Sequence, residues 1–324
     1  METQELTRAA RLIPLALPKG TEKLCELCQN RAYLQCAQCR VTFYCNDSHQ
    51  FADWVGIHQL ICPLLVPIRL YQDLSKESKI EKDIKKRELI GIARAVAERK
   101  LGEGKHEEAL PAGQTCLSFS IDVFGPRTIQ LVPAYLLLAE ANMGLGKLSQ
   151  AAELLSQAEW SVSKHSDCGH EVRHRLHRSL GVLQTATGNL EGALFHFAND
   201  IYHAEEACLD STVRSKGHFL MAGVFAKQGK TSIARSMYNQ VAQTWHSQLA
   251  KLTEPFLEDP PSSMQPTLDR ATQVEGDKIL QTILDFEQKQ IRKEPGLIVL
   301  TLHCLAMLWF MAGDRVKVNL VTWA

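Results

Sequence analysis

The distribution of apolar and polar positions divides the chain into three regions. Residues 1–24 contain a short apolar stretch broken by Pro14 and Pro18, so we expect an extended leader. Residues 25–62 hold a dense group of cysteines. From about residue 66 the chain is rich in Ala, Leu, Glu, Gln and Lys, which favours helices nearly throughout. The sequence therefore predicts a mainly α fold with one small cysteine-rich module.

Small residues recur at a fixed period within the helical region. Glycines separated by 42, 42 and 41 residues are each followed five positions later by an alanine and preceded seven positions earlier by another small residue. The members of these columns are Gly104, Gly146, Gly188 and Gly229; Ala109, Ala151, Ala193 and Ala234; and Ala97, Ala139, Gly181 and Ala222. Gly313 follows two periods after Gly229. Such periodicity predicts stacked copies of one supersecondary unit.

Each unit is expected to be a helix, a turn and a second helix. The small residue lets the two helices approach closely, and the glycine ends the first helix in a left-handed backbone conformation. The alanine then packs the second helix against the first. This pattern resembles the tetratricopeptide repeat, with a period about two helical turns longer than that family's usual ~34 residues. The resemblance implies an α-helical solenoid that binds peptides or helices.

The repeats define the expected organisation of the remaining chain. It comprises a linker helix at 63–89, repeats at 90–254, a proline-rich loop at 255–266 and C-terminal helices at 267–324. In the last region we expect a long helix at about 267–293 and a first repeat helix at about 297–312. An incomplete final repeat is expected after that helix.

Two helical segments allow alternative interpretations. The run from Leu297 to Gly313 has no charged residue, but a membrane span needs about 20 apolar residues. Because this run also fits the repeat register, we expect a buried core helix. Residues 75–88 mix six positive and four negative charges, with Ile80 and Ile84 one turn apart. We favour a solvated helix here over a basic binding patch.

The composition excludes several classes of partner. Of the 324 residues, 45% are hydrophobic and 22% are charged, and 36 Lys and Arg balance 36 Asp and Glu. This neutral chain gives no electrostatic basis for binding nucleic acid or an acidic membrane. The sequence contains no P-loop, dinucleotide-binding glycine pattern or nucleophile elbow. We therefore expect a protein that is not an enzyme and has neither a nucleic-acid nor a membrane partner.

The cysteines are concentrated in one segment. Six of the ten lie between Cys25 and Cys62. Glu2 and Glu5 precede the broken apolar stretch of the leader, which is unlike a secretory signal. We expect an intracellular protein in a reducing compartment, where clustered cysteines bind metal rather than form disulfides.

The cysteine cluster consists of four ligand pairs. They are Cys25-x2-Cys28, Cys36-x2-Cys39, Cys45-x3-His49 and His58-x3-Cys62. A Cys-x2-Cys knuckle aims two thiolates at one metal, and an x3 spacing places two ligands one helical turn apart. Eight such ligands are enough for two tetrahedral zinc ions with no open position, so we expect structural zinc. A segment of this length also needs metal to fold.

The cluster resembles the MYND-type zinc finger. Tyr44-Cys45, Gln50, Asp53-Trp54 and His58 match the end of that family's pattern. The resemblance implies interleaved zinc sites, one formed by Cys25, Cys28, Cys45 and His49 and the other by Cys36, Cys39, His58 and Cys62. It also implies that a proline-containing peptide binds beside Gln50 and Trp54, although Trp54 could equally belong to the core.

The sequence departs from the MYND pattern at two places. His49 stands where cysteine is usual, which leaves both sites with three Cys and one His. Three residues rather than two separate Trp54 from His58, so the resemblance does not define the shape of that loop.

A group of histidines is a weaker candidate for a third metal site. His170, His174 and His177 share one face of a predicted helix. Three arginines interleave with them and would repel a cation, so we favour a structural role in the packing of a repeat.

The expected concave face of the repeats carries excess positive charge. By resemblance to tetratricopeptide arrays, its lining residues include Arg94, Arg175, Arg178, Lys216 and Lys227, against Glu98 and Glu140. A concave surface focuses such a field. We therefore expect an acidic helix or extended peptide as partner, unless the chain's own helix around 267–293 fills the groove.

These features predict a non-catalytic zinc-binding adaptor that joins other proteins. Proteins that combine MYND fingers with tetratricopeptide repeats recur in motile cilia and dynein assembly, so the resemblance implies a cilium or flagellum. The alternative is a nuclear or cytoplasmic adaptor of the corepressor type. A lysine methyltransferase is disfavoured because its catalytic motifs do not appear in the sequence, and a DNA-binding finger is disfavoured by the neutral charge.

Overall fold

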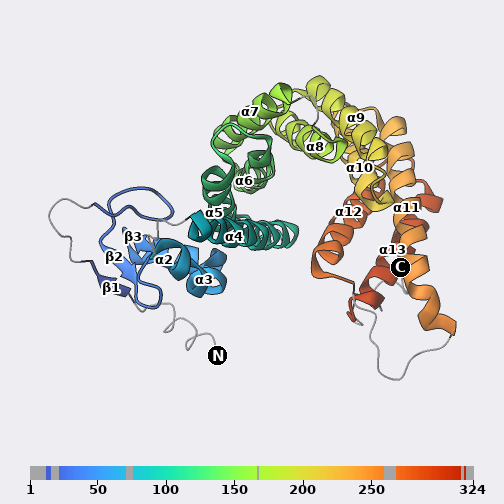
Figure 1. Ribbon diagram of the computed structural model, residues 1–324. Coiled ribbons are helices and arrows are strands. Elements are labelled where there is room, and N and C mark those ends of the chain that lie inside the picture. Colours follow the sequence, from blue (N-terminus) through green and yellow to red (C-terminus); the bar gives the residue numbers. More distant parts are fainter. Residues whose placement is uncertain are drawn as a thin grey trace. The chain divides into compact units, whose positions relative to one another are not determined.

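The protein is mainly α-helical, with a small zinc-finger-like module followed by helices that pack in neighbouring pairs (Figure 1). The computed structural model describes residues 12–15, 22–70, 76–165, 168–258, 268–314 and 317–318. The chain forms two compact units. The first contains residues up to Leu101 and Lys105–His165, and the second contains Gly102–Gly104 and the chain from Ser166 onward.

A three-stranded antiparallel sheet begins the first unit. Its strands β1 (Leu12–Pro14), β2 (Leu34–Cys36) and β3 (Phe43–Tyr44) lie in the order β1-β2-β3. Leu12 is opposite Cys36, and Leu34 is opposite Tyr44. The described part of the leader is therefore extended, and it adds an edge strand to the cysteine-rich module. The rest of the predicted leader, residues 1–11 and 16–21, lies outside the described residues.

One continuous helical run follows the sheet. It consists of α2 (Asp47–Asp53), a single π-helical turn η1 (Trp54–His58) and α3 (Gln59–Arg69). The Asn46 side chain caps its start by accepting a hydrogen bond from the His49 amide. This run of 23 residues is long and apolar enough to cross a membrane by length and composition alone, and 44% of its apolar window is buried inside the protein. Partial burial of this kind is typical of a helix that contributes to a core.

The remaining helices of the first unit form two helix pairs. They are α4 (Lys76–Gly102), α5 (His106–Phe124), α6 (Val132–Gly144) and α7 (Leu148–Lys164), with a short 3-10 turn η2 (Ile129–Leu131) before α6. Leu89, Ala93, Val96 and Ala97 of α4 are buried at helical spacing. Ile80 and Ile84 are exposed, as expected for a solvated first half of this helix.

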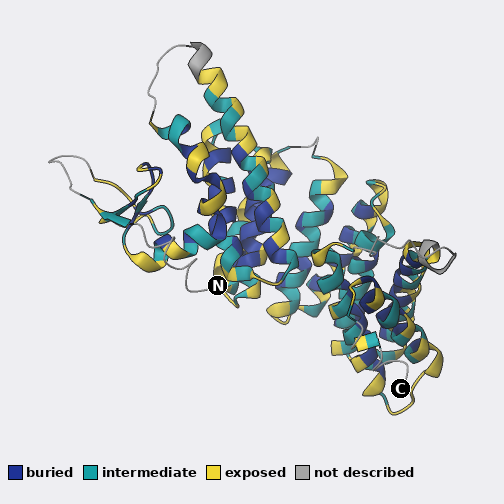
Figure 2. Ribbon diagram, turned by 90° about the horizontal axis from the view of Figure 1, so that it is seen from below, coloured by how far each residue is buried: buried dark blue, intermediate teal, exposed yellow. Residues whose placement is uncertain are grey.

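The second unit contains three further helix pairs. They are α8 (His170–Ala186) with α9 (Leu190–Glu206), α10 (Ser211–Lys227) with α11 (Thr231–Glu258), and α12 (Arg270–Gln288) with α13 (Pro295–Met311). Helix α13 packs on α11 and α12, and Cys304, Leu305 and Leu308 are fully buried in the core of these helices. The uncharged run at 297–313 is therefore a core helix. Figure 2 shows buried residues where the helices of each unit face one another.

The repeat glycines adopt the predicted left-handed conformation. The φ angles of Gly104, Gly146, Gly188, Gly229 and Gly313 lie between 72° and 86°. At Gly146 the amide donates to the Met143 carbonyl, and the next amide, of Lys147, donates to the Asn142 carbonyl at 2.9 Å. These two hydrogen bonds satisfy backbone carbonyls at the end of the helix.

The small residues also lie where the repeat pattern places them. The alanines of the second helices are buried, as are Ala97, Ala139 and Ala222 of the first helices. A Cβ atom added to Gly181 would lie 2.5 Å from the Phe197 ring of the paired helix. Small residues therefore set the close approach within each pair.

Element boundaries differ from the prediction at two places. The predicted linker helix 63–89 corresponds to two helices, since α3 ends at Arg69 and α4 begins at Lys76. Pro63 and Pro67 lie inside α3 and not at its end, so the prolines of this segment do not predict where the helix ends. Helix α11 runs to Glu258, past the expected loop start at 255. Residues 259–267 lie outside the described residues.

Candidate metal centre

The first ligand group joins the first and third sequence pairs. Cys25 and Cys28 come from the knuckle after residue 24, and Cys45 and His49 come from the end of β3 and the first turn of α2. His49 Nδ1 lies 3.4 Å from Cys25 Sγ and 3.1 Å from Cys45 Sγ, and the sulfurs of Cys28 and Cys45 are 3.6 Å apart. These four ligands are partly exposed, apart from Cys25, which is buried.

The second ligand group joins the second and fourth pairs and is fully buried. Cys36 and Cys39 come from β2 and the turn after it, His58 ends the π-helical turn, and Cys62 lies in α3. The sulfurs of Cys36 and Cys62 are 4.0 Å apart, and Cys39 Sγ lies 3.7 Å from His58 Nε2. The interleaving of the four sequence pairs is thus present in the structure.

Each group fits one zinc ion. Within each, all four ligand atoms lie within 4.8 Å of one another, and three thiols and one imidazole match the preferred ligands of tetrahedral zinc. A hydrogen bond from Cys36 and another with His58 lower the pKa of Cys39, which favours the thiolate form that binds metal. Four protein ligands leave no open coordination position. Zinc in both sites is therefore structural.

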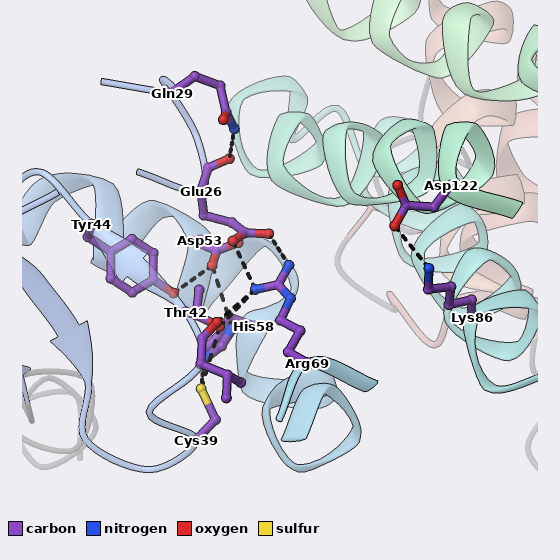
Figure 3. A network of polar contacts seen from close by, with 11 residues as sticks. Glu26, Gln29, Cys39, Thr42, Tyr44, Asp53, His58, Arg69, Lys86 and Asp122 are labelled. Atoms are coloured by element: carbon purple, nitrogen blue, oxygen red, sulfur yellow. Dashed lines mark hydrogen bonds and ion pairs between the residues drawn. The ribbon is translucent and has the colours of Figure 1, made fainter. Parts of the chain in front are cut away.

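A carboxylate fixes the orientation of the buried histidine ligand. Asp53 Oδ2 lies 3.6 Å from His58 Nδ1 and accepts a 2.7 Å hydrogen bond from the Tyr44 hydroxyl (Figure 3). His58 therefore presents Nε2 to the metal while Nδ1 faces the carboxylate, an arrangement that raises ligand basicity. Burial raises the pKa of Asp53 to about 6, and burial together with Asp53 raises the pKa of Tyr44. Tyr44 thus stays protonated and donates.

A second ion pair holds the first knuckle against α3. The Arg69 guanidinium binds both carboxylate oxygens of Glu26, at 3.0 and 2.6 Å, and donates to the Val41 carbonyl and the Thr42 hydroxyl (Figure 3). Glu26 lies between Cys25 and Cys28, so the pair connects one zinc knuckle to the end of the last helix of the module. Planar bidentate pairs of this kind are geometrically specific.

The additional residue between Trp54 and His58 is accommodated by the π-helical turn. The amide of Gln59 donates to the Trp54 carbonyl, five residues earlier. A π turn adds one residue to a helix without ending it, so His58 and Cys62 still face the second site.

The cysteine-rich module shares one core with the helices that follow it. Gly56 of the π turn abuts Pro111 of α5, where an added Cβ would lie 2.6 Å from the proline ring. Ile57, Ile61 and Leu65 belong to the same buried cluster as Leu89 and Phe119 of α4 and α5. The module is therefore an integral part of the first unit.

The ligand spacing, the interleaved sites and the residues around them now define the module. Residues 25–62 match the family model of the MYND finger. The chain is also similar to the crystal structure of BtubC (BKLC) from P. vanneervenii, with 17% identity over 72% of this chain and 87% of that chain. The TM-score of 0.34 is too low for this likeness to support an argument.

The two residues expected to bind a peptide on the MYND finger lie in different environments. Gln50 is buried, with 4% of its surface exposed, and α2 packs against α5. Trp54 is half-buried, with its ring 5.8 Å from the His58 ring, and its neighbour Phe51 is exposed. Trp54 and Phe51 are thus two aromatic residues of the finger that are accessible at its surface.

The residues expected to line the groove are divided between the two units. In the first unit Arg94 pairs with Glu98 one turn away, at 3.0 Å. In the second unit Arg178 binds the buried Asp200 at 2.9 Å, and Lys216 binds Glu275 of α12 at 2.7 Å. The chain's own helix at 270–288 thus engages one lining residue. The other expected residues are Glu140, which is exposed in the first unit, and Arg175 and Lys227, which are partly buried and exposed, respectively, in the second.

The residues that support the ligands are not evident from the sequence. Tyr44 and Asp53 match the family pattern, but that pattern assigns them no contact, and Glu26 and Arg69 belong to no motif. A buried acidic residue five positions before a ligand histidine gives a weak signal. The pairing of Glu26 with Arg69, 43 residues later, gives none in a single sequence.

Proposed function

We propose that this protein is a zinc-dependent, non-catalytic adaptor that joins other proteins. The observation that carries the proposal is the MYND finger, a protein-interaction module whose two four-ligand sites have no open position and whose core is continuous with helical repeats. A structural zinc module packed against helices presents rigid surfaces to a partner rather than a reactive centre. Neutral charge favours protein partners over nucleic acid or membrane.

The first binding surface that we propose is the finger face around Trp54. It would bind a proline-containing segment, because aromatic rings pack well on proline. Trp54→Ala should abolish binding of such a peptide while two zinc ions remain bound. Leu60→Ala, at an exposed position on the same helical run, is the matched control. Loss of zinc together with binding would instead assign Trp54 to the core.

The second binding surface is the positively charged face of the repeats in the second unit. It would bind an acidic helix or extended peptide more weakly as salt rises. Reversal of Arg178 is an unsuitable test, because its ion pair with buried Asp200 supports α8 and α9. Arg175→Glu and Lys227→Glu test the charge directly, with Lys251→Glu as the control on an exposed site. Undiminished binding at low salt would contradict this part of the proposal.

The cellular placement that we propose is the cilium or sperm flagellum, in axonemal dynein assembly or function. Its support is analogy: a finger followed by helical repeats resembles zinc finger MYND domain-containing protein 12. Proximity labelling with the wild-type chain and a Cys36→Ser variant, in ciliated and non-ciliated cells, tests it. Zinc-dependent labelling of axonemal proteins is expected. Labelling of nuclear repressor complexes would favour the corepressor-type adaptor instead.

A further inference from the structure

Four histidines meet between helices α8 and α9. His170 and His177 lie seven residues apart on α8, and His196 and His203 lie seven apart on α9. Because the helices are antiparallel, the rings pair across the interface. The Nδ1 atoms of His170 and His203 are 3.0 Å apart, as are those of His177 and His196. The His177 and His203 rings stack at 5.6 Å, so the two pairs are neighbours.

A buried ion-pair network holds the two helices in place beside these rings. His174 Nδ1 lies 2.9 Å from Asp200 Oδ1, and Arg178 donates to the other oxygen of that carboxylate. Arg178 also donates to the Val213 carbonyl. His174 is therefore structural, as expected from the sequence. The structure separates it from its neighbours His170 and His177, which face the rings of α9.

The paired imidazoles bring the ring nitrogens that bind metals close together, with two Nδ1 atoms in each pair. A neutral imidazole has a free lone pair on one nitrogen and is the form that binds metals. Within each pair one ring accepts the hydrogen bond of the other. When both Nδ1 atoms bind a metal ion, the donating ring carries its proton on Nε2 instead, so both imidazoles stay neutral.

The separation of the nitrogens is compatible with two ligands of one metal ion. With metal–nitrogen bonds of about 2.05 Å, adjacent ligands lie roughly 2.9 to 3.3 Å apart. The observed 3.0 Å is the length of the hydrogen bond between the rings, so a metal ion can take its place with little movement of the helices. Imidazole nitrogens suit Ni²⁺ and Cu²⁺.

We propose that the pairs His170–His203 and His177–His196 each bind one divalent transition metal ion of the Ni²⁺ and Cu²⁺ type. Each pair supplies two adjacent imidazole ligands, and water completes the coordination at this partly exposed surface. These histidines lie on α8 and α9 and are separate from the MYND finger, where each cluster already supplies four ligands to its own zinc ion. A bound ion bridges α8 to α9 and adds to the stability of that helix pair.

The surrounding charges leave the site close to neutral. The groups that face it are Arg173, Arg178, Asp200 and Glu206. Asp200 is paired with Arg178, and Arg173 donates from Nε to the carbonyl of Cys168. Two of the three arginines that interleave with these histidines, Arg173 and Arg178, are thus engaged with acceptors of the chain itself.

Calorimetric titration of the full-length, zinc-loaded chain with Ni²⁺ tests the proposal. Elemental analysis afterwards should still find two zinc ions, which shows that the finger is not the site. The variant H170Q/H177Q/H196Q/H203Q should bind Ni²⁺ at least tenfold more weakly. The variant H165Q/H218Q is the matched control, because the Nδ1 atoms of His165 and His218 lie against backbone carbonyls of their own helices rather than against a second imidazole.

The control variant should keep the wild-type affinity. Absence of Ni²⁺ binding up to millimolar concentration, unchanged affinity in the fourfold variant, or loss of binding in H165Q/H218Q would each overturn the proposal. If the fourfold variant does not fold by circular dichroism, H170Q/H203Q decides, because this pair is exposed. Weaker Ni²⁺ binding in that variant supports the site, and unchanged binding overturns it.

Discussion

At the scale of single residues, the zinc sites depend on side chains that do not touch the metal. Asp53 and Tyr44 orient His58, and Arg69 ties Glu26 to the end of α3. Gly56 allows the π turn to approach Pro111. Each of these residues contributes one contact that a small substitution removes, so each can be tested without deleting a ligand.

Asp53→Asn should weaken zinc binding at the buried site by about 10–100-fold and leave the other site unchanged. The amide lacks the negative charge that holds the His58 ring and raises its basicity. Competition with a chromophoric chelator, which resolves the two ions by affinity, is the measurement. Tyr44→Phe removes only the hydrogen bond to Asp53 and should have a smaller effect. Equal weakening of both sites would contradict this role for Asp53.

Gly56→Ala should destabilise the first unit by about 1–3 kcal/mol, because the added methyl group overlaps the Pro111 ring. Gly91→Ala is the control. Gly91 lies within α4 with nothing within 4 Å of an added Cβ, so alanine should stabilise the helix by up to about 1 kcal/mol. Urea unfolding of both variants gives the comparison. Equal shifts of the same sign would show that the contact with Pro111 is unimportant.

At the scale of elements, one helix ends in the left-handed conformation at a residue that is not glycine. Cys208 has a φ of 52° and ends α9 with the hydrogen bonds seen at the repeat glycines. The second element-scale feature is the pairing of histidines between α8 and α9, which makes this helix pair sensitive to protons. Both features lie in the second unit.

Cys208→Gly should stabilise the protein by about 1 kcal/mol, because glycine adopts the left-handed conformation without the strain of a Cβ. Gly188→Ala, at a φ of 86°, should destabilise by a similar amount. Cys208→Ser keeps the strain and removes the thiol, so it should leave the free energy of unfolding unchanged. A gain in the serine variant equal to that in the glycine variant would assign the effect to the thiol.

The second unit should lose stability as the pH falls from about 6.5 towards 4. Burial and two neighbouring histidines lower the pKa of His177 to about 4 in the folded protein, whereas the unfolded residue titrates near 6.5. The unfolded state therefore binds the proton first, and one such group contributes at most about 1.4 kcal/mol per pH unit. Urea unfolding at pH 7.5 and 5.5 should show a smaller loss in His177→Gln than in the wild type. Equal losses of stability in the variant and the wild type would show that His177 is not the group responsible.

At the scale of the whole molecule, the two units have separate cores. One core joins the MYND finger to the helices from α3 to α6, and another joins α10 to α13. The finger is thus a structural part of one unit only. Its metal content should affect the two units differently.

Removal of both zinc ions by a chelator should unfold the finger and loosen α4 and α5, with little effect on α10–α13. The finger contributes Ile57, Ile61 and Leu65 to the first core and nothing to the second. Hydrogen–deuterium exchange is the measurement. Amide protection should fall in residues 25–69 and on the faces of α4 and α5 that meet the finger. A matching loss of protection in α11 and α13 would show that the two cores are coupled.

The sequence alone determined the features that depend on spacing and residue type. Four ligand pairs predicted two zinc sites, and recurring glycines predicted where helices end, because coordination and left-handed turns are satisfied by residues close together in the chain. Only the tertiary structure decided the rest. The contact of Glu26 with Arg69, the burial of Gln50, the shared core and the four-histidine cluster all arise where distant segments pack together. Packing brings such residues into contact by geometry that one sequence does not encode locally.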